Sequence, residues 1–227
     1  MSFWLEAVVS SPWFDSGCGA GPRARWTTGG GIEIEGEGEL KKPLPAAVKK
    51  WSSEIAVAAK KYDVWENFIA GFVATESGGV QEAHSYCCYG LMGLLPATAS
   101  SMAGRQVSPN ELVANPALNI ELGTKLIDQL LDKYQNNPIK VAAAYNAGSP
   151  KCGAGKCSTP NRFNLVADCV NGGAVDYVTR IIGYSNSARL LTFPSGVSST
   201  RSTSSNALPW IVGGALAVGA AVYLGGK

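Results

Sequence analysis

The chain has 227 residues, of which 46% are hydrophobic and 16% are charged, so its main body should build a core. Its net charge of +2 is too small to indicate a nucleic-acid-binding protein, although a mildly basic surface is compatible with an anionic polymer such as a cell wall. The single histidine, His84, argues against zinc peptidases and amidases, which normally take two or more ligands from histidine. We therefore expect no metal and no cofactor.

The six cysteines are even in number, which fits disulfides formed in an oxidising compartment. Cys152 and Cys157 bracket a short glycine-rich loop, GAGK, and form the most plausible pair. A structural zinc site that also uses Cys169, or free buried thiols, are the alternatives. The adjacent Cys87 and Cys88 are not expected to bridge each other, because the ring would be strained.

Residues 1–44 are predicted to form an irregular N-terminal segment, with tryptophans among Gly, Ser and Pro. No basic region precedes an apolar one here, so no conventional signal peptide is expected. The stretch GGGIEIEGEGEL at 29–40 alternates as a strand does, and it predicts a solvated linker or a short hairpin.

Residues 45–192 are predicted to form one mainly helical domain, because apolar residues recur there at helical spacing. Asn115 followed by a proline is a typical helix start, and Gly148 with Pro150 ends another helix. The candidate helices are AAVKKWSSEIAVAAKKY, VWENFIAGFVATE, PATASSMAG, NPALNIELGTKLIDQLLDKY, PIKVAAAYNAG and AVDYVTRIIGYSNSARLL.

The C-terminal part of the chain is predicted to be a serine-rich linker at 193–206 and a transmembrane anchor at 207–227. Residues 208–226 carry no charge, and about 18 helical residues reach roughly 27 Å, close to the thickness of a thin bilayer. Trp210 and Tyr223 lie near the two ends, as residues at a membrane interface do. A buried hairpin or core helix is the alternative.

The stretch ATESGG places one acid, Glu76, at the end of an apolar helix. Glu76 falls on the same face as a stripe made of Trp65, Phe68, Ile69, Phe72 and Val73. Apolar surroundings and the negative end of a helix both disfavour an ionised carboxylate, so the pKa of Glu76 should be raised, as a general acid requires. Gly78 and Gly79 should end the helix and leave room for a ligand. The alternative is a helix-end residue paired with Lys or Arg.

Five segments of the chain form an ordered set of motifs: ATESGG, SYCCYGLMGLLPATA, NPALNIELGTKLIDQLLDKY, AAAYNAG and YVTRI. Together they resemble the lytic transglycosylases related to goose-type lysozyme, over roughly residues 62–185. The resemblance implies a mainly α, lysozyme-like fold with a cleft for glycan strands, here followed by the predicted single transmembrane helix. It also implies cleavage of the β-1,4 bond between N-acetylmuramic acid and N-acetylglucosamine in peptidoglycan.

The resemblance also implies roles for particular residues. Glu76 would be the acid/base, and the hydroxyl of Tyr145 would lie near it. The substrate-binding residues would be Ser77, Gly90, Leu91, Met92 and Asn146. Separately from the resemblance, the unusual segment AHSYCCY before Gly90 offers Tyr86 or Tyr89 for stacking on a sugar, and we count Tyr89 among the substrate-binding residues. One residue departs from the pattern: Gly93 stands where the family commonly has Gln, which removes an amide from the cleft.

Ordinary glycosidases use two carboxyl groups, and Glu82, Asp168 or Asp176 could supply a second one. None of these lies in a recognisable motif. The resemblance implies that none is needed, because the substrate's N-acetyl group assists and the muramoyl 6-hydroxyl attacks intramolecularly, giving an anhydromuramoyl end. A hydrolytic muramidase and a catalytically silent glycan-binding or structural protein are the alternatives.

A small wall-cutting domain with a membrane anchor resembles virion enzymes of phages with an internal membrane, which open the wall for genome delivery. A bacterial cell envelope is the alternative location. The expected partners are peptidoglycan strands and a lipid bilayer bound through residues 208–226, with a second copy of the chain or virion membrane proteins as further candidates. Nucleic acid is not expected as a partner.

Overall fold

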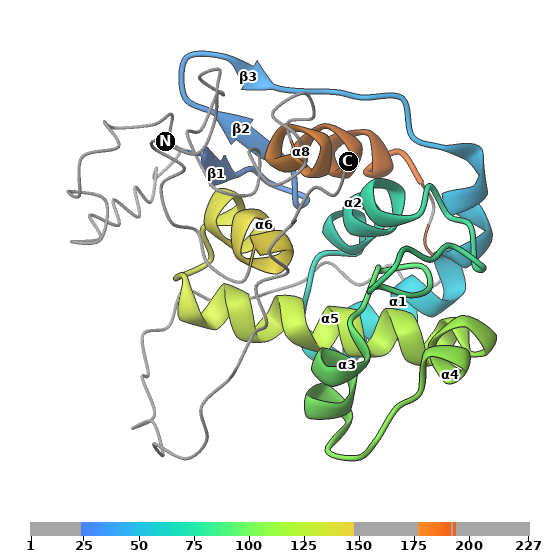
Figure 1. The fold of residues 1–227 in the computed structure, drawn as a ribbon. Helices are drawn as coiled ribbons and strands as arrows, with labels where there is room; N and C mark the ends of the chain where they lie inside the picture. Colours follow the sequence, from blue (N-terminus) through green and yellow to red (C-terminus); the bar gives the residue numbers. More distant parts are fainter. Residues whose placement is uncertain (1–23, 148–176, 192, 194–227) are drawn as a thin grey trace, which may run out of the picture.

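The computed structural model describes residues 24–147, 177–191 and 193, and it is mainly helical, as predicted (Figure 1). A small sheet of β1 (Ala24–Trp26), β2 (Ile32–Ile34) and β3 (Gly38–Glu39) precedes the helices. The helical elements are η2 (Ala46–Trp51), α1 (Ser52–Tyr62), α2 (Glu66–Glu76), α3 (Pro96–Ala103), α4 (Pro109–Ala114), α5 (Pro116–Lys133), α6 (Pro138–Ala147) and α8 (Tyr177–Ala188).

The predicted helices are present within the described residues, with two differences. The first segment is not one helix, since a 3-10 helix, η2, precedes α1. The short helix α4 was not predicted; Ser108 caps it by accepting a hydrogen bond from the Glu111 N–H at 3.1 Å. Asn115 caps α5 in the same way, by accepting from the Leu118 N–H at 3.0 Å, which confirms the predicted helix start.

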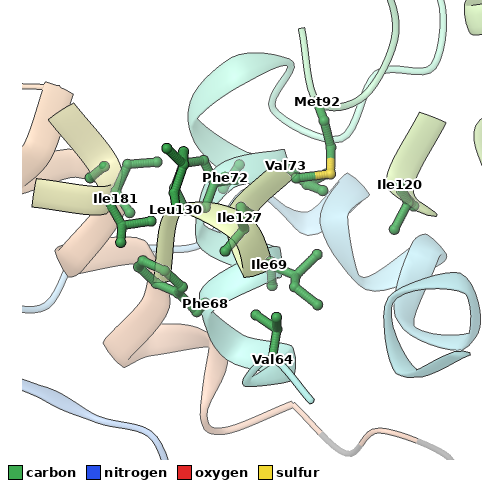
Figure 2. Close-up of a cluster of buried hydrophobic side chains, with 14 of the residues drawn as sticks. Val64, Phe68, Ile69, Phe72, Val73, Met92, Ile120, Ile127, Leu130 and Ile181 are labelled. Carbon is green, nitrogen blue, oxygen red and sulfur yellow. The ribbon is translucent and has the colours of Figure 1, made fainter. Parts of the chain in front are cut away.

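Helix α2 lies at the centre of the domain, and every residue from 67 to 75 is buried. The sequence had predicted a helix with one apolar face. The difference arises because other elements pack around α2, and Phe68, Phe72 and Ile181 meet in one core cluster between α2 and α8 (Figure 2). A central helix presents its last residue, Glu76, from a rigid and largely apolar support.

Helices α2 and α8 pack closely because Gly71 has no side chain. A Cβ at residue 71 would lie 2.2 Å from the Ser185 hydroxyl oxygen and 2.8 Å from the Ile181 carbonyl oxygen. The Ser185 hydroxyl donates its own hydrogen bond to that carbonyl at 2.6 Å, so this wall of α8 cannot easily move away. The contact fixes the distance between the two helices.

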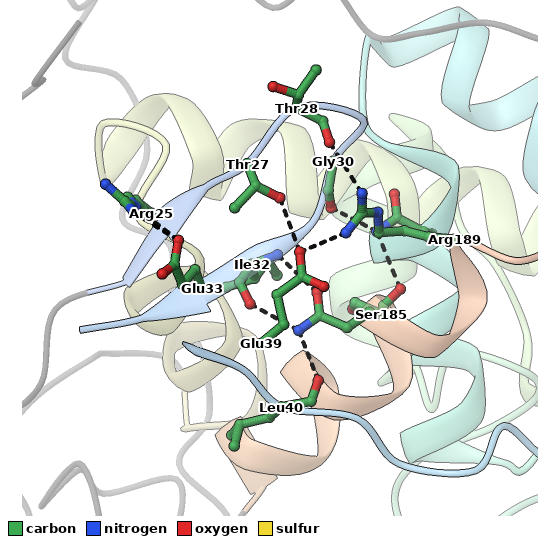
Figure 3. Close-up of polar contacts among 12 residues, drawn as sticks. Arg25, Thr27, Thr28, Gly30, Ile32, Glu33, Glu39, Leu40, Ser185 and Arg189 are labelled. Atoms are coloured by element: carbon green, nitrogen blue, oxygen red, sulfur yellow. Dashed lines mark hydrogen bonds and ion pairs between the residues drawn. The ribbon is translucent and has the colours of Figure 1, made fainter. Parts of the chain in front are cut away.

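The three-stranded sheet is antiparallel with the order β1-β2-β3, and it packs on α8. The side chains of Ile32 and Ile34 are fully buried. The Asn186 amide of α8 accepts from the Ile32 N–H at 2.7 Å and donates to the Ile32 and Leu40 carbonyls at 2.8 Å (Figure 3). Arg189 adds an ion pair with Glu39 at 2.6 Å.

The prediction of an irregular segment over residues 1–44 is therefore wrong for the strands between residues 24 and 39, whereas the short hairpin predicted at 29–40 is confirmed by the pairing of β2 with β3. The brief alternation of IEI was the correct signal, because it places two isoleucines on one face that the helices cover. A turn joins β2 to β3, where Gly36 and Gly38 adopt positive φ. These residues belong to the same folded body as α8.

The prediction that Cys87 and Cys88 do not bridge is also wrong, because the structure joins them in a disulfide. They lie in a tight turn that Ser85 organises. Its N–H donates to the Cys88 carbonyl at 2.9 Å, and its hydroxyl oxygen accepts from the Cys88 N–H at 3.2 Å. The sequence rule assumed an ordinary backbone between the cysteines and did not anticipate this turn.

Several predictions fall outside the described residues. The anchor at 207–227 and the pairing of Cys152 with Cys157 are among them, as is the zinc alternative that adds Cys169. Within the described residues, no helix is both long and apolar enough to cross a bilayer.

Gly71→Ala is expected to lower the free energy of unfolding by about 1–3 kcal/mol, because the added methyl overpacks the contact with Ser185. Helix propensity alone predicts the opposite, a gain of about 1 kcal/mol. Val57→Ala, at a site of α1 that is 70% exposed, is the control and should change stability little. Urea unfolding measures both, and a stabilised Gly71→Ala variant would contradict the packing argument.

Candidate active site

Glu76 is the last residue of α2 and is half-buried. The helix ends there because Ser77 leaves the helical conformation and Gly78 and Gly79 adopt φ values of +64° and +86°. The Ser77 hydroxyl donates to the Val73 carbonyl at 3.0 Å and accepts from the Gly79 N–H at 3.1 Å. The predicted helix stop is confirmed, and the Ser77 side chain forms part of it.

Tyr177, at the start of α8, donates a hydrogen bond from its hydroxyl to Oε1 of Glu76. One turn further along, Arg180 donates to the carbonyl of Thr75 at 2.7 Å, at the C-terminal end of α2. The segment YVTRI is part of the family pattern, but the sequence alone assigned no role to Tyr177 or Arg180. The two residues are three positions apart and so share one face of the helix. This spacing was the feature of the sequence that could have identified them.

The segment from Tyr89 to Gly93 forms a turn beside Glu76, and Asn119 of α5 holds it. Asn119 is fully buried; its Oδ1 accepts from the Met92 N–H at 2.8 Å and its Nδ2 donates to the Tyr89 carbonyl at 2.9 Å. The Tyr145 hydroxyl donates to the Met92 carbonyl at 2.8 Å. Both backbone groups of Met92 are thus bound, so the turn is fixed from two sides. Sequence reasoning missed Asn119, a polar residue inside the apolar face of α5.

The predicted substrate-binding residues of this turn need revision. The side chains of Leu91 and Met92 are fully buried in the core, where Met92 lies among the residues of Figure 2. Gly90 is buried too, since a Cβ there would lie 2.3 Å from Asn119. The side chains of Leu91 and Met92 therefore do not line a groove, and they pack in the core beside the turn.

Two other predicted substrate-binding residues, Tyr89 and Asn146, are partly exposed to solvent. Tyr89 is half-buried, and its backbone pairs with Leu94 in an isolated β-bridge. Asn146 is half-buried near the end of α6. Binding of substrate by Tyr89 and Asn146 stays a prediction.

The charge of Glu76 acts on Tyr145, but the Tyr145 hydroxyl donates its hydrogen bond to the Met92 carbonyl, so a catalytic role for Tyr145 stays a prediction. Its ring packs on Phe72 of α2 at a centroid distance of 4.6 Å. Burial, and next the charge of Glu76, raise the pKa of Tyr145 well above its ordinary value. The same causes, together with the bond to Glu76, raise the pKa of Tyr177, so both phenols stay protonated near neutral pH.

Burial raises the pKa of Glu76 from 4.5 to about 7, against the hydrogen bond from Tyr177 and the charge of Arg180, which both lower it. The predicted direction is confirmed. At neutral pH the carboxyl group therefore keeps a proton more readily than an exposed glutamate does. Among the described residues no Lys or Arg forms an ion pair with Glu76, because Arg180 binds the neighbouring carbonyl.

Of the three candidate second acids, Glu82 is exposed in the loop after α2, and Asp168 and Asp176 lie outside the described residues. No cluster of three or more His, Cys, Asp or Glu side chains that could hold a metal occurs within the part of the chain that the structure describes. Two hollows on the described surface lie elsewhere, over α1 and α5 on either side of Lys61 and Glu121.

Residues 53–160 match the family described as the transglycosylase SLT domain. The predicted relationship of this region to lytic transglycosylases is confirmed by this match.

Two curated relatives are similar to this domain. A putative soluble lytic murein transglycosylase of Haemophilus influenzae is 35% identical over 107 residues, which are 45% of this chain and 18% of the relative. The membrane-bound lytic murein transglycosylase E of Buchnera aphidicola is 32% identical over 99 residues, which are 41% of this chain and 45% of the relative. The chain thus spans less than half of the length of either protein.

Solved structures of soluble lytic transglycosylases are also similar. The enzyme Slt of Pseudomonas aeruginosa aligns with a TM-score of 0.47 and 24% identity, over 58% of this chain and 22% of that chain. The 70 kDa enzyme of Escherichia coli aligns with a TM-score of 0.46 and 23% identity, over 58% of this chain and 23% of that chain.

The raised pKa of Glu76 predicts a dependence of stability on pH. Because the folded state holds the proton more tightly than the unfolded state, the contribution of Glu76 is fully present below pH 4.5 and is lost as pH rises through about 7. Glutamine does not ionise, so the Glu76→Gln variant should not lose this stability as the pH rises. The difference in unfolding free energy, variant minus wild type, should therefore grow between pH 4.5 and about pH 7, by at most about 3 kcal/mol. Urea unfolding of both proteins from pH 4 to pH 8 measures it, and parallel stability curves would contradict the assignment.

Proposed function

We propose that the chain is a lytic transglycosylase that cleaves the β-1,4 bond between N-acetylmuramic acid and N-acetylglucosamine, with Glu76 as its single acid/base. The observation that carries this proposal is the carboxyl group of Glu76 at the end of a rigid helix. Burial raises its pKa to about 7, and it accepts a hydrogen bond from Tyr177. A group that is partly protonated at neutral pH can both donate and accept a proton. The match of residues 53–160 to the SLT family supports the same reaction class.

In the first step, protonated Glu76 gives its proton to the glycosidic oxygen while the bond from the muramoyl C1 to that oxygen breaks. The carbonyl oxygen of the substrate's N-acetyl group forms a bond to C1 as the leaving group departs. Burial suits this step, because it keeps the proton on the carboxyl group until a sugar oxygen can take it.

In the second step, ionised Glu76 takes the proton of the muramoyl 6-hydroxyl. The 6-oxygen then bonds to C1 and displaces the N-acetyl oxygen, which leaves a 1,6-anhydro end and returns Glu76 to its protonated form. The hydroxyl and C1 belong to the same sugar, so their effective concentration is high and no water needs to be positioned. The hydrogen bond from Tyr177 stabilises the ionised state that this step needs.

No second carboxyl group acts on the pKa of Glu76 in the described residues, where Tyr177 and Arg180 are the partners that influence it. Asp168 and Asp176 lie outside the described residues, so the hydrolytic route, which would use a base to activate water, stays the alternative.

Digestion of purified murein tests the proposal. Wild-type protein should release glycan products with anhydromuramoyl ends, each lighter by one water than the product of a hydrolase, and Glu76→Gln should lower the rate by about 100-fold or more. Mass spectrometry of the products measures both. Products with reducing ends would instead establish a muramidase, and full activity of Glu76→Gln would exclude the assigned acid.

We also propose that residues 208–226 attach the protein to a lipid bilayer, on the basis of their uncharged, apolar sequence. Full-length protein should float with phospholipid vesicles, whereas a variant ending at residue 206 should stay in the dense fraction and still cleave murein. Flotation of both proteins would contradict an anchor in this segment. The setting in a virion with an internal membrane, with genome delivery as its purpose, stays a prediction from the sequence.

A further inference from the structure

The last turn of α2 leaves backbone carbonyl groups without helical partners, as the end of every helix does. The two carbonyls before that of Thr75 accept hydrogen bonds from neutral donors just past the helix, the Ser77 hydroxyl at 3.0 Å and the Gly78 N–H at 3.2 Å. The Thr75 carbonyl accepts instead from Arg180 of α8, at 2.7 Å. A cation from another helix therefore closes the end of α2 that carries Glu76.

Arg180 acts on the carboxyl group of Glu76 without binding it. Oε1 accepts its hydrogen bond from Tyr177, and the backbone of Gly93 packs against Oε2, since a Cβ on that glycine would lie 2.6 Å from the oxygen. Neither an ion pair nor a hydrogen bond joins Arg180 to Glu76 in the part of the chain that the structure describes. The bond to Thr75 thus holds the guanidinium group near the carboxyl group, and the guanidinium group occupies neither oxygen.

The charge of Arg180 opposes two features that disfavour an ionised carboxylate. Burial is the largest cause that raises the pKa of Glu76, and the negative end of α2 acts in the same direction. The hydrogen bond from Tyr177 and the charge of Arg180 lower that pKa. A guanidinium group bound directly to the carboxylate would hold it ionised more strongly, and the carboxyl group would then have no proton to give. A cation held on the neighbouring carbonyl permits both protonation states.

We propose that Arg180 is a positioning residue which, held on the Thr75 carbonyl, stabilises the negative charge that develops on Glu76 as its proton leaves for the glycosidic oxygen. The inference rests on the proposed function, since it names the group that balances charge in that reaction. In the first step the O–H bond of Glu76 breaks and its electron pair stays on the carboxylate, while the leaving oxygen takes the proton and the electron pair of its bond to C1. In the second step the carboxylate takes the proton of the 6-hydroxyl, and the negative charge near Arg180 disappears.

Arg180 is the group of opposite charge in this environment. The phenols of Tyr177 and Tyr145 stay protonated and neutral near neutral pH, because burial and the charge of Glu76 raise the pKa of each. The turn from Gly90 to Gly93 contains no titratable side chain. Two further elements, η2 and α1, pack on α2, and among the described residues their charged side chains have no influence on the pKa of Glu76. These side chains are Lys49, Lys50, Glu54, Lys60 and Lys61.

Arg180→Met tests the proposal, with Lys125→Met as the matched control. Lys125 of α5 donates to the Met102 carbonyl at 2.7 Å, and Met102 is the last residue but one of α3, as Thr75 is of α2. Both cations are half-buried, so each variant removes a similar cation from a helix end, and only Arg180→Met removes it beside Glu76. We expect Arg180→Met to lower kcat on murein by about 10-fold with little change in KM, and Lys125→Met to leave both near wild type.

The pH dependence of activity separates this role from a merely structural one. Loss of the positive charge favours the protonated carboxyl group, so Arg180→Met should move the high-pH limit of activity to higher pH. Arg180→Lys keeps a positive charge and should keep this limit and most of kcat. A structural role would lower kcat in both variants without moving the limit. An unchanged kcat or an unshifted limit in Arg180→Met, or an equal shift in Arg180→Lys or Lys125→Met, would overturn the proposal.

Titration of the Glu76 carboxyl carbon by NMR does not depend on murein cleavage. In the full chain, the pKa should be higher in Arg180→Met than in wild type, Arg180→Lys and Lys125→Met. If wild type failed to cleave murein, the proposed function would fall, and this titration would still decide whether Arg180 balances the charge of Glu76. If Arg180→Met did not fold, Arg180→Gln would replace it, because glutamine keeps a hydrogen-bond donor without the charge: a raised pKa of Glu76 supports the proposal, and an unchanged one sinks it.

Discussion

The arrangement of the site depends on the close packing of α2 against α8. Gly71 allows the two helices to meet at a distance that a methyl group would prevent, and Ser185 and the Ile181 carbonyl form the opposite wall. This contact brings the start of α8 to the end of α2, about 100 residues earlier in the chain. Tyr177 reaches Oε1 of Glu76, and Arg180 reaches the Thr75 carbonyl, because the helices are in this register.

The same packing explains the state of the carboxyl group. Glu76 ends a helix that is buried on all sides, so it loses water that an exposed helix end would keep. Tyr177 and Arg180 compensate for part of that cost, and the balance leaves the pKa of Glu76 near neutral rather than far above it. A group in this balance can serve as acid and base in turn, which is what a reaction with a single carboxyl group requires. The small sheet contributes indirectly, since Asn186 and Arg189 tie it to α8 (Figure 3).

The turn from Gly90 to Gly93 is the second fixed part of the site. Sequence reasoning had assigned its apolar residues to a glycan groove, but Leu91 and Met92 are core residues. A motif match identifies a segment and does not tell which atoms of it face the substrate. Here the side chains anchor the turn in the core, Asn119 and Tyr145 hold its backbone, and the residue without a side chain faces Glu76.

The sequence by itself determined the mainly helical domain, the end of α2 at Glu76 and the raised pKa of that residue, because these follow from local periodicity, glycine placement and burial. It also indicated the family, because the order of the motifs along the chain can be read without knowledge of the fold. Only the tertiary structure decided that Tyr177, Asn119 and Gly93 surround the site, since each comes from a different element and no local pattern encodes their meeting. The disulfide between Cys87 and Cys88 and the sheet at residues 24–39 likewise depended on contacts that distant parts of the chain, or a particular turn, supply.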